Sequence, residues 1–202
     1  MPYAKIPLAF YRRPDPVQIA RELLGKYVYT NLNGIITGGR IVETEAYAHV
    51  NDQACHSHLG RYTARTQIMY EPGGVAYVYL VYGRYALFNL ITNEVGKADA
   101  VLIRGLEPTV GIPEMLLRRG ITAVQRNLTG GPGLLTQALG ITVQHYGTNL
   151  TGDLIWLEDH QEPVTEDLIV ASPRVGIDYA GEDAALPWRF RLKASKWTSP
   201  AK

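Results

Sequence analysis

The chain lacks the features that mark several classes of protein. It has a single cysteine, Cys55, so it cannot form an intrachain disulfide, which is typical of proteins from a reducing compartment. No apolar run is long enough to cross a membrane, and prolines and charges interrupt residues 1–16, where a signal peptide needs an unbroken apolar run. The formal net charge is only +1, so binding to a polyanion would depend on a local patch. We expect a cytoplasmic protein with no secretion signal and no membrane contact.

The composition is that of an ordinary globular protein with one unusual bias. Of the 202 residues, 46% are apolar and 19% are charged, which suits one domain with a sizeable core. Thirteen tyrosines stand against three phenylalanines. Tyrosine combines a flat stacking face with a polar tip, so this bias suits a wet site that binds planar ligands. Many of these side chains would simply line strand edges.

Turn and capping signals divide the chain into short strands and a few helices. Asp15 followed by Pro16 is a good helix start, and Asn33-Gly34 and Gly83 are tight-turn signals between strand-like runs. One expected hairpin joins residues 26–32 to 35–47, and the other joins residues 74–82 to 85–91. Further strands are expected at 100–106, 155–158, 168–171 and 188–193. Helices are expected at 113–119 and 132–139. The predicted fold is mixed α/β (α+β), one domain over residues 1–202 with a curved, largely antiparallel β-sheet, flanking helices and a protruding β-hairpin.

The segment 40–47, RIVETEAY, places two carboxylates and a phenol in a predicted strand. Side chains alternate across a strand, so Glu43, Glu45 and Tyr47 would share one face. Glutamate is depleted in strands and rarely buried without a partner. One interpretation is an active-site wall, in which a carboxylate activates water and an aromatic ring holds a substrate. The other is an edge strand with a solvated polar face, and this segment alone leaves both open.

Six segments together resemble one known family over about residues 8–200. They are RIVETEAY at 40–47, ACHSH at 54–58, YVYLVYGRYALFN at 77–89, VLIRGLEP at 101–108, GGPGLLTQALGI at 130–141 and PRVGIDYAGEDAALPWRF at 173–190. In this order they resemble the alkyladenine DNA glycosylases, also called 3-methyladenine or N-methylpurine DNA glycosylases. The resemblance implies a monofunctional enzyme of base excision repair, acting on alkylation damage in double-stranded DNA as a monomer without a cofactor or an obligate protein partner.

The resemblance assigns the catalytic centre to two side chains and one backbone group. Glu45 matches the general base, which deprotonates the water that attacks C1′ of the sugar. Arg104 matches the arginine beside this carboxylate, where its charge would keep Glu45 ionised. Val175 matches a position whose backbone carbonyl contacts the attacking water. An outward-facing arginine is the alternative for Arg104.

The resemblance also implies a base pocket and a wedge. An N-methylated purine carries positive charge, which aromatic faces attract; the residues expected around the flipped base are Tyr47, His56, Tyr79 and Asn89. Tyr82, beside the turn glycine, matches the side chain that fills the gap left by the flipped nucleotide. Possible DNA contacts are Arg84, Tyr85, Arg61 and Arg65. The loop 61–70 departs from the pattern expected for the family, so its contacts are the least defined.

Two rival functions remain open from the residues alone. Glu43 would lie about 7 Å along the strand from Glu45, near the carboxylate spacing of an inverting hydrolase of small nucleosides or carbohydrates. A protein that binds damaged nucleic acid without catalysis could use the same hairpin wedge. No metal is expected, because His56 and His58 lack further ligands at metal-binding spacing.

Overall fold

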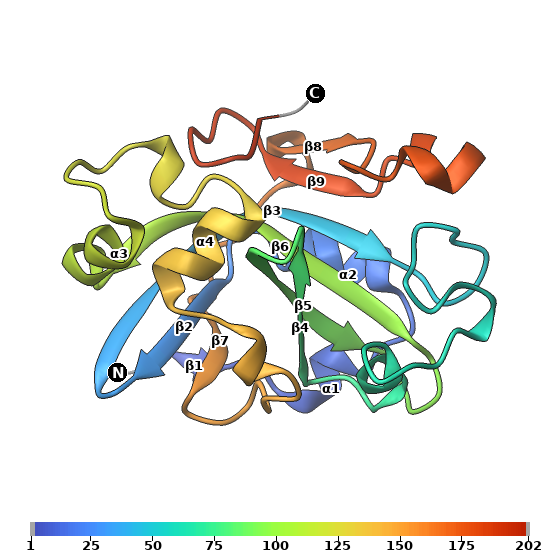
Figure 1. Ribbon diagram of the computed structural model, residues 1–202. Coiled ribbons are helices and arrows are strands. Elements are labelled where there is room, and N and C mark those ends of the chain that lie inside the picture. The colour runs from blue at the N-terminus through green and yellow to red at the C-terminus, as the bar shows by residue number, and fades with distance from the viewer. Residues whose placement is uncertain (1–2, 201–202) are drawn as a thin grey trace.

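One antiparallel sheet organises residues 3–200, the part of the chain that the computed structural model describes (Figure 1). Its strands are β1 (Ala4–Lys5), β2 (Tyr27–Leu32), β3 (Ile35–Tyr47), β4 (Ala76–Val81), β5 (Tyr85–Thr92), β6 (Asp99–Val110), β7 (Ile155–Asp159), β8 (Ile169–Ser172) and β9 (Arg189–Leu192). They are arranged in the order β1-β7-β2-β3-β6-β5-β4, while β9 pairs with β3 and carries β8. The predicted α+β class with a largely antiparallel sheet is confirmed.

Short helices flank this sheet. The α-helices are α1 (Leu8–Tyr11), α2 (Pro16–Glu22), α3 (Ile112–Arg119) and α4 (Pro132–Leu139). Segments of 3₁₀ helix lie at His58–Gly60, Gln67–Tyr70, Arg126–Leu128, Val143–His145, Glu166–Leu168 and Asp178–Ala185. In the view of Figure 1, α4 lies in front of the sheet and α2 behind it. The Asp15 carboxylate caps α2 by accepting from two backbone N–H groups, as its sequence predicts. No helix within residues 3–200 is long and apolar enough to span a membrane.

Strand β3 lies inside the sheet. It pairs with β2 on one side and with β6 on the other, and its residues 43–45 also pair with β9. The side chains of Glu43 and Glu45 are fully buried. The interpretation of this segment as a solvated edge strand is therefore wrong. The register of the β3–β6 pairing shifts on both sides of Glu43, and such irregularities re-aim side chains near functional sites.

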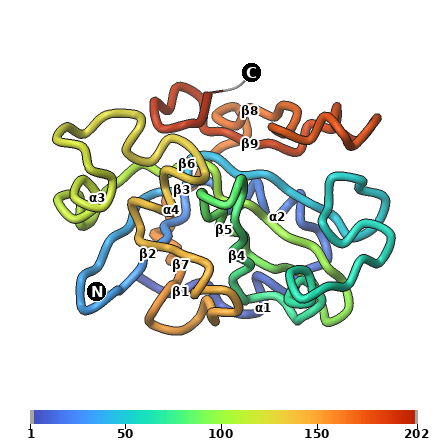
Figure 2. Tube along the Cα trace, viewed as in Figure 1, coloured from blue at the N-terminus to red at the C-terminus, as the bar shows by residue number. Residues whose placement is uncertain are grey.

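The hairpin formed by β4 and β5 ends in an exposed turn. Tyr82 and Gly83 both have positive φ, 52° and 64°, and the side chain of Tyr82 is 93% exposed. Positive φ is uncommon for a tyrosine, so the backbone of this turn is strained. The strained turn holds a large ring in solvent. Figure 2 shows the hairpin in green near the centre of the view. The long loop 48–73 lies at the right of the molecule, in teal. Between them they frame the pocket described next.

Candidate active site

The carboxylate of Glu45 receives three hydrogen bonds from three separate parts of the chain. Its Oε2 accepts from the Tyr47 hydroxyl at 2.8 Å and from Nη1 of Arg104 at 3.2 Å. Its Oε1 accepts from the backbone N–H of Val175 at 2.8 Å. The structure thus brings to Glu45 the two residues expected in the catalytic centre, Arg104 and Val175, and also Tyr47, which was expected around the flipped base. For Val175 the group in contact with Glu45 is the N–H.

Arg104 bridges the two glutamates of β3. Its Nε donates to Oε1 of Glu43 at 3.2 Å while Nη1 donates to Glu45. Burial lowers the pKa of the Arg104 guanidinium, but the charges of Glu45 and Glu43 outweigh this, so the pKa is raised overall. Arg104 therefore stays cationic. Its side chain is 7% exposed, so the alternative of an outward-facing arginine is wrong.

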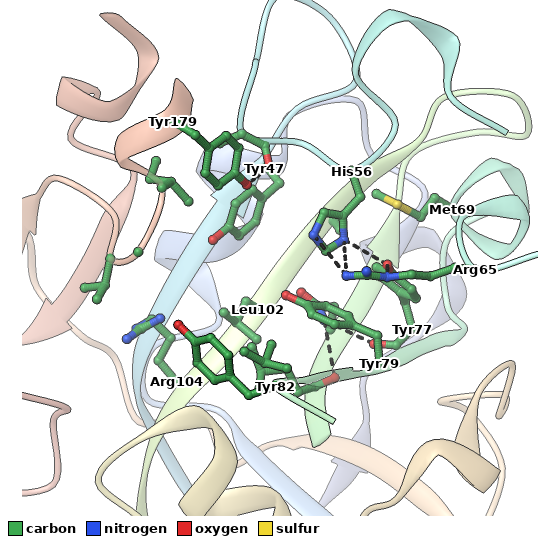
Figure 3. A pocket seen from close by; sticks show the side chains of 18 residues that line it. Tyr47, His56, Arg65, Met69, Tyr77, Tyr79, Tyr82, Leu102, Arg104 and Tyr179 are labelled. Atoms are coloured by element: carbon green, nitrogen blue, oxygen red, sulfur yellow. Dashed lines mark hydrogen bonds between the residues drawn. The ribbon is translucent and has the colours of Figure 1, made fainter. Parts of the chain in front are cut away.

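A cavity of about 280 Å³ opens beside this cluster (Figure 3). Eight of the residues singled out from the sequence line it: Tyr47, His56, Arg65, Tyr79, Tyr82, Asn89, Arg104 and Val175. Glu45 is buried directly behind the wall that its three partners form. Aromatic and polar side chains make up half of the residues that line the cavity, and small or aliphatic residues make up the other half.

The other possible DNA contacts lie outside the cavity. Arg84 and Tyr85 line a neighbouring groove beside α4. Arg61 lies in the exposed part of the loop 48–73. These three residues do not line the pocket.

Arg65 occupies one side of the pocket. Its guanidinium lies 4.5 Å from the ring centre of Tyr79, its Nε donates to the Tyr77 hydroxyl at 3.2 Å, and its Nη2 lies 3.2 Å from Nε2 of His56. Burial, together with the charges of Arg65 and Arg61, lowers the pKa of His56 to about 4. His56 is therefore neutral at pH 7, and one of its ring nitrogens can accept a hydrogen bond.

Two tyrosines of the pocket stay protonated and each has an arginine near its ring. Burial and the charge of Glu45 raise the pKa of Tyr47 well above its usual value, so its hydroxyl donates to the carboxylate. Burial likewise raises the pKa of Tyr79. The guanidinium of Arg174 lies 4.9 Å from the ring centre of Tyr47, and that of Arg65 lies 4.5 Å from the ring centre of Tyr79. These rings are thus electron-rich surfaces already in contact with cations.

Several residues of the site were not predicted from the sequence. Arg174 forms a fully buried bidentate ion pair with Asp52, with N–O distances of 2.6 and 2.8 Å, and also donates to the carbonyl of Ala46 at 2.9 Å. This pair fixes the segment that presents the N–H of Val175. The pocket is also lined by Tyr77 and Tyr179. The sequence signal that could have indicated Arg174 was its position next to Val175 in the PRVG segment. No sequence signal indicated Asp52, which lies in a polar loop.

Glu43 lies apart from the cavity and does not line it. Its carboxylate is occupied by Arg104, Arg189 and Ser199. The inverting-hydrolase interpretation requires a second carboxylate that faces the substrate. Glu43 does not meet this requirement. Within the described residues, no group of three or more His, Cys, Asp or Glu side chains is placed to hold a metal ion.

Comparison with known proteins shows the family of this chain. A family model described as methylpurine-DNA glycosylase (MPG) matches residues 9–196. The "Putative 3-methyladenine DNA glycosylase" of Bacillus cereus strain AH187 is 44% identical over 201 residues, covering 96% of this chain and 98% of the relative. Proteins of the same name are 44% identical in Bacillus anthracis strain A0248, with the same coverage, and 43% identical over 203 residues in Bacillus cytotoxicus, covering 96% of this chain and 99% of the relative.

These matches place the chain among the hydrolases that act on N-glycosyl bonds, in DNA repair. It belongs to the methylpurine-DNA glycosylase family. The family and enzyme class predicted from the sequence are confirmed, and DNA is the substrate that the family implies.

Proposed function

We propose that this protein is a monofunctional glycosylase that flips alkylated or deaminated purines out of duplex DNA and hydrolyses the N-glycosidic bond with a water activated by Glu45. Bases of the 3-methyladenine, 7-methylguanine and hypoxanthine type are the expected range, and an abasic site is the product. The observation that carries this proposal is the buried Glu45 carboxylate, held by Arg104, Tyr47 and Val175 at the wall of an aromatic cavity.

The three hydrogen bonds that Glu45 accepts from the described residues leave one lone-pair position for a water. A carboxylate has about four lone-pair positions, and three donors from the described residues reach this one, two on Oε2 and one on Oε1. A water that donates to the remaining position on Oε1 would be oriented for attack on C1′. As the C1′–N bond breaks, the base takes the bonding electrons, the water oxygen bonds to C1′ and Glu45 takes the proton. The carboxylate would also stabilise the positive charge that develops on the sugar.

The pocket suits a flat, electron-poor base. Tyr47 and Tyr79 present π faces that attract a cationic purine, by about 0.5–2 kcal/mol for each contact. Neutral His56 can hydrogen-bond a base edge. Asn89, whose Nδ2 donates to the Tyr77 carbonyl at 3.1 Å, is fixed in the pocket wall, where it would crowd the 2-position of a purine and disfavour guanine. A methylated base leaves as a neutral molecule, so this class needs the least help from the protein.

The exposed Tyr82 suits the wedge role. It lies both at the tip of the hairpin and at the rim of the cavity. A ring in this place can enter the stack while the flipped base enters the pocket, offsetting the few kcal/mol that extrusion costs. Arg84 and Tyr85 beside it, and the exposed Arg61, would contact the DNA backbone.

The test is base release from a short duplex with one hypoxanthine and from methylated genomic DNA, by wild type and by Glu45→Gln. Wild type should release bases and leave abasic sites, and Glu45→Gln should be at least about 100-fold slower while still binding the lesion duplex. Glu158→Gln is the matched control, because Glu158 lies on β7, away from the cavity, and pairs with His160.

Near wild-type release by Glu45→Gln would refute the assignment of the general base. Lesion-selective binding by wild type without base release from either substrate would favour a non-catalytic damage binder instead. Turnover of free nucleosides, lost in Glu43→Gln, would favour the small-nucleoside hydrolase.

A further inference from the structure

Glu43 receives four hydrogen bonds although it does not face the pocket. Its Oε1 accepts from Nε of Arg104 at 3.2 Å, from Nε of Arg189 at 2.6 Å and from the hydroxyl of Ser199 at 2.7 Å, and its Oε2 accepts from the backbone N–H of Ser199. Glu43 is fully buried, while Arg189 and Ser199 are 1% and 4% exposed. Desolvating a carboxylate so completely is costly unless it is paired and hydrogen-bonded, and here all the donors converge on one group.

The donors from Ser199 come from the C-terminal segment, which crosses strand β6 beside the catalytic arginine. A Cβ on Gly105, the neighbour of Arg104, would lie 2.8 Å from the carbonyl oxygen of Trp197, so only glycine permits this crossing. The indole of Trp197 is buried in the main core. The carbonyl of Thr198 accepts from Nε of Arg126 at 3.0 Å. The segment is therefore firmly docked, and it lies beyond residue 196, where the family match ends.

Ser199 and Glu43 together decide which nitrogen of Arg104 reaches the catalytic carboxylate. Nε of Arg104 is taken by Glu43, and Nη2 donates to the Ser199 hydroxyl at 3.2 Å. Nη1 is the nitrogen that donates to Glu45. An arginine free of these restraints would pair with a carboxylate through two parallel N–H groups, its preferred geometry. Such a pair would occupy the lone-pair position on Glu45 that the attacking water needs.

We propose that Glu43 and Ser199 are positioning residues that hold Arg104 to a single contact with Glu45, so that the C-terminal segment forms part of the active centre. This inference rests on the proposed role of Glu45 as general base. It makes Glu43 a partner of the arginine, without contact to DNA or to the reacting atoms.

The test is single-turnover base release from a saturating hypoxanthine duplex, with the Kd for the same duplex measured in parallel. Glu43→Gln should slow release about 100-fold, which is the cost of a small misplacement in a catalytic centre. Ser199→Ala, which keeps every charge and the backbone N–H bond to Glu43, should slow it about tenfold. The Kd should change less than threefold, because neither residue lines the pocket.

Thr30→Val is the control for lost stability. Thr30 is fully buried on β2, away from the cavity, and its hydroxyl bonds Thr37 and the carbonyl of Leu139, both at 2.8 Å. This variant should lose stability and keep the wild-type rate. A slowing of Thr30→Val equal to that of Ser199→Ala would mean that stability alone sets the rate, which would overturn the proposal. So would rates of Glu43→Gln and Ser199→Ala within threefold of wild type.

A double-mutant cycle with Arg104→Lys separates positioning from a purely structural role. Lysine keeps the charge but cannot reach several partners at once as the guanidinium fork does. If Glu43 acts through Arg104, adding Glu43→Gln to Arg104→Lys should cost less than threefold. Independent, multiplying losses would overturn the proposal. Base release by wild type with no effect of Glu43→Gln would overturn this inference alone, whereas absence of release by wild type would overturn the proposed function itself.

Discussion

The wall and the mouth of the cavity are built in opposite ways. The wall is Arg104, which lines the cavity, backed by Glu43 and Glu45, which do not. All three are buried on the paired strands β3 and β6 and tied by hydrogen bonds from four parts of the chain. The mouth consists of the exposed residues 59–65 of the loop 48–73 and the turn at Tyr82, whose side chain is almost fully exposed. In the wall each charge has fixed partners, and at the mouth rings and cations face the cavity or solvent.

This difference separates positioning from recognition. A group that transfers a proton must be placed within a fraction of an ångström, which paired strands and closed hydrogen-bond networks achieve. A group that meets a duplex must adapt to it, and turns and loops supply such surfaces. Substitutions in the wall should therefore cost stability or rate, whereas those at the mouth should change mainly substrate handling.

The largest effect is expected from breaking the buried ion pair behind the wall. Asp52→Ala leaves the Arg174 guanidinium buried without its carboxylate, which should lower the free energy of unfolding by about 3–5 kcal/mol. Asp153→Ala is the control, because Asp153 pairs with Lys5 on the surface and should cost no more than about 1 kcal/mol. Urea unfolding measures both. Equal losses would show that the segment before Val175 is not anchored by this pair.

A smaller effect concerns pH. The unfolded chain binds a proton at His56 near pH 6.5 and the folded protein near pH 4, because burial and Arg65 disfavour the charged ring. The unfolded state therefore binds more protons in this window, and the free energy of unfolding falls as the pH is lowered through it, by on the order of 3 kcal/mol. Urea unfolding at pH 7, 5.5 and 4.5 should show a shallower fall for His56→Gln. The same slope in both proteins would refute the burial argument.

The wedge should affect excision without affecting stability. Tyr82→Ala removes an exposed ring, so the free energy of unfolding should stay within about 0.5 kcal/mol of wild type. Release of hypoxanthine from a duplex should slow about tenfold, because base–aromatic stacking contributes about 1–3 kcal/mol, and Tyr82→Phe should restore it. Tyr3→Ala, which removes another exposed tyrosine, should leave the rate unchanged. A full rate in Tyr82→Ala would mean that the hairpin tip does not enter the DNA.

The smallest effect is expected at Arg65. Its cation lies over Tyr79, where it would repel a charged base more than a neutral one. Arg65→Ala should raise the ratio of 7-methylguanine release to hypoxanthine release about threefold, in line with a cation–π contact of about 0.5–1 kcal/mol. Arg61→Ala is the control, because Arg61 shares the loop but does not line the cavity. A lower ratio in Arg65→Ala would show that this cation assists charged bases.

Most of the fold could be predicted from the sequence. The turn at Asn33-Gly34 and the cap at Asp15 depend on neighbouring residues, and both lie where predicted. Strand β6 runs further than the predicted 100–106, because its pairing with the long strand β3 extends it past the local pattern. The interior place of β3 was not predictable, since alternation alone does not show how many neighbours a strand has.

The sequence by itself determined the strand pattern, the exposed hairpin turn and the family, because these depend on local periodicity, turn chemistry and the order of several motifs. Only the tertiary structure decided what surrounds Glu43 and Asp52. Glu43 and Ser199 are 156 positions apart, and Asp52 and Arg174 are 122 apart. A buried charge takes whichever partner the fold brings within hydrogen-bond distance, and no local pattern encodes that choice.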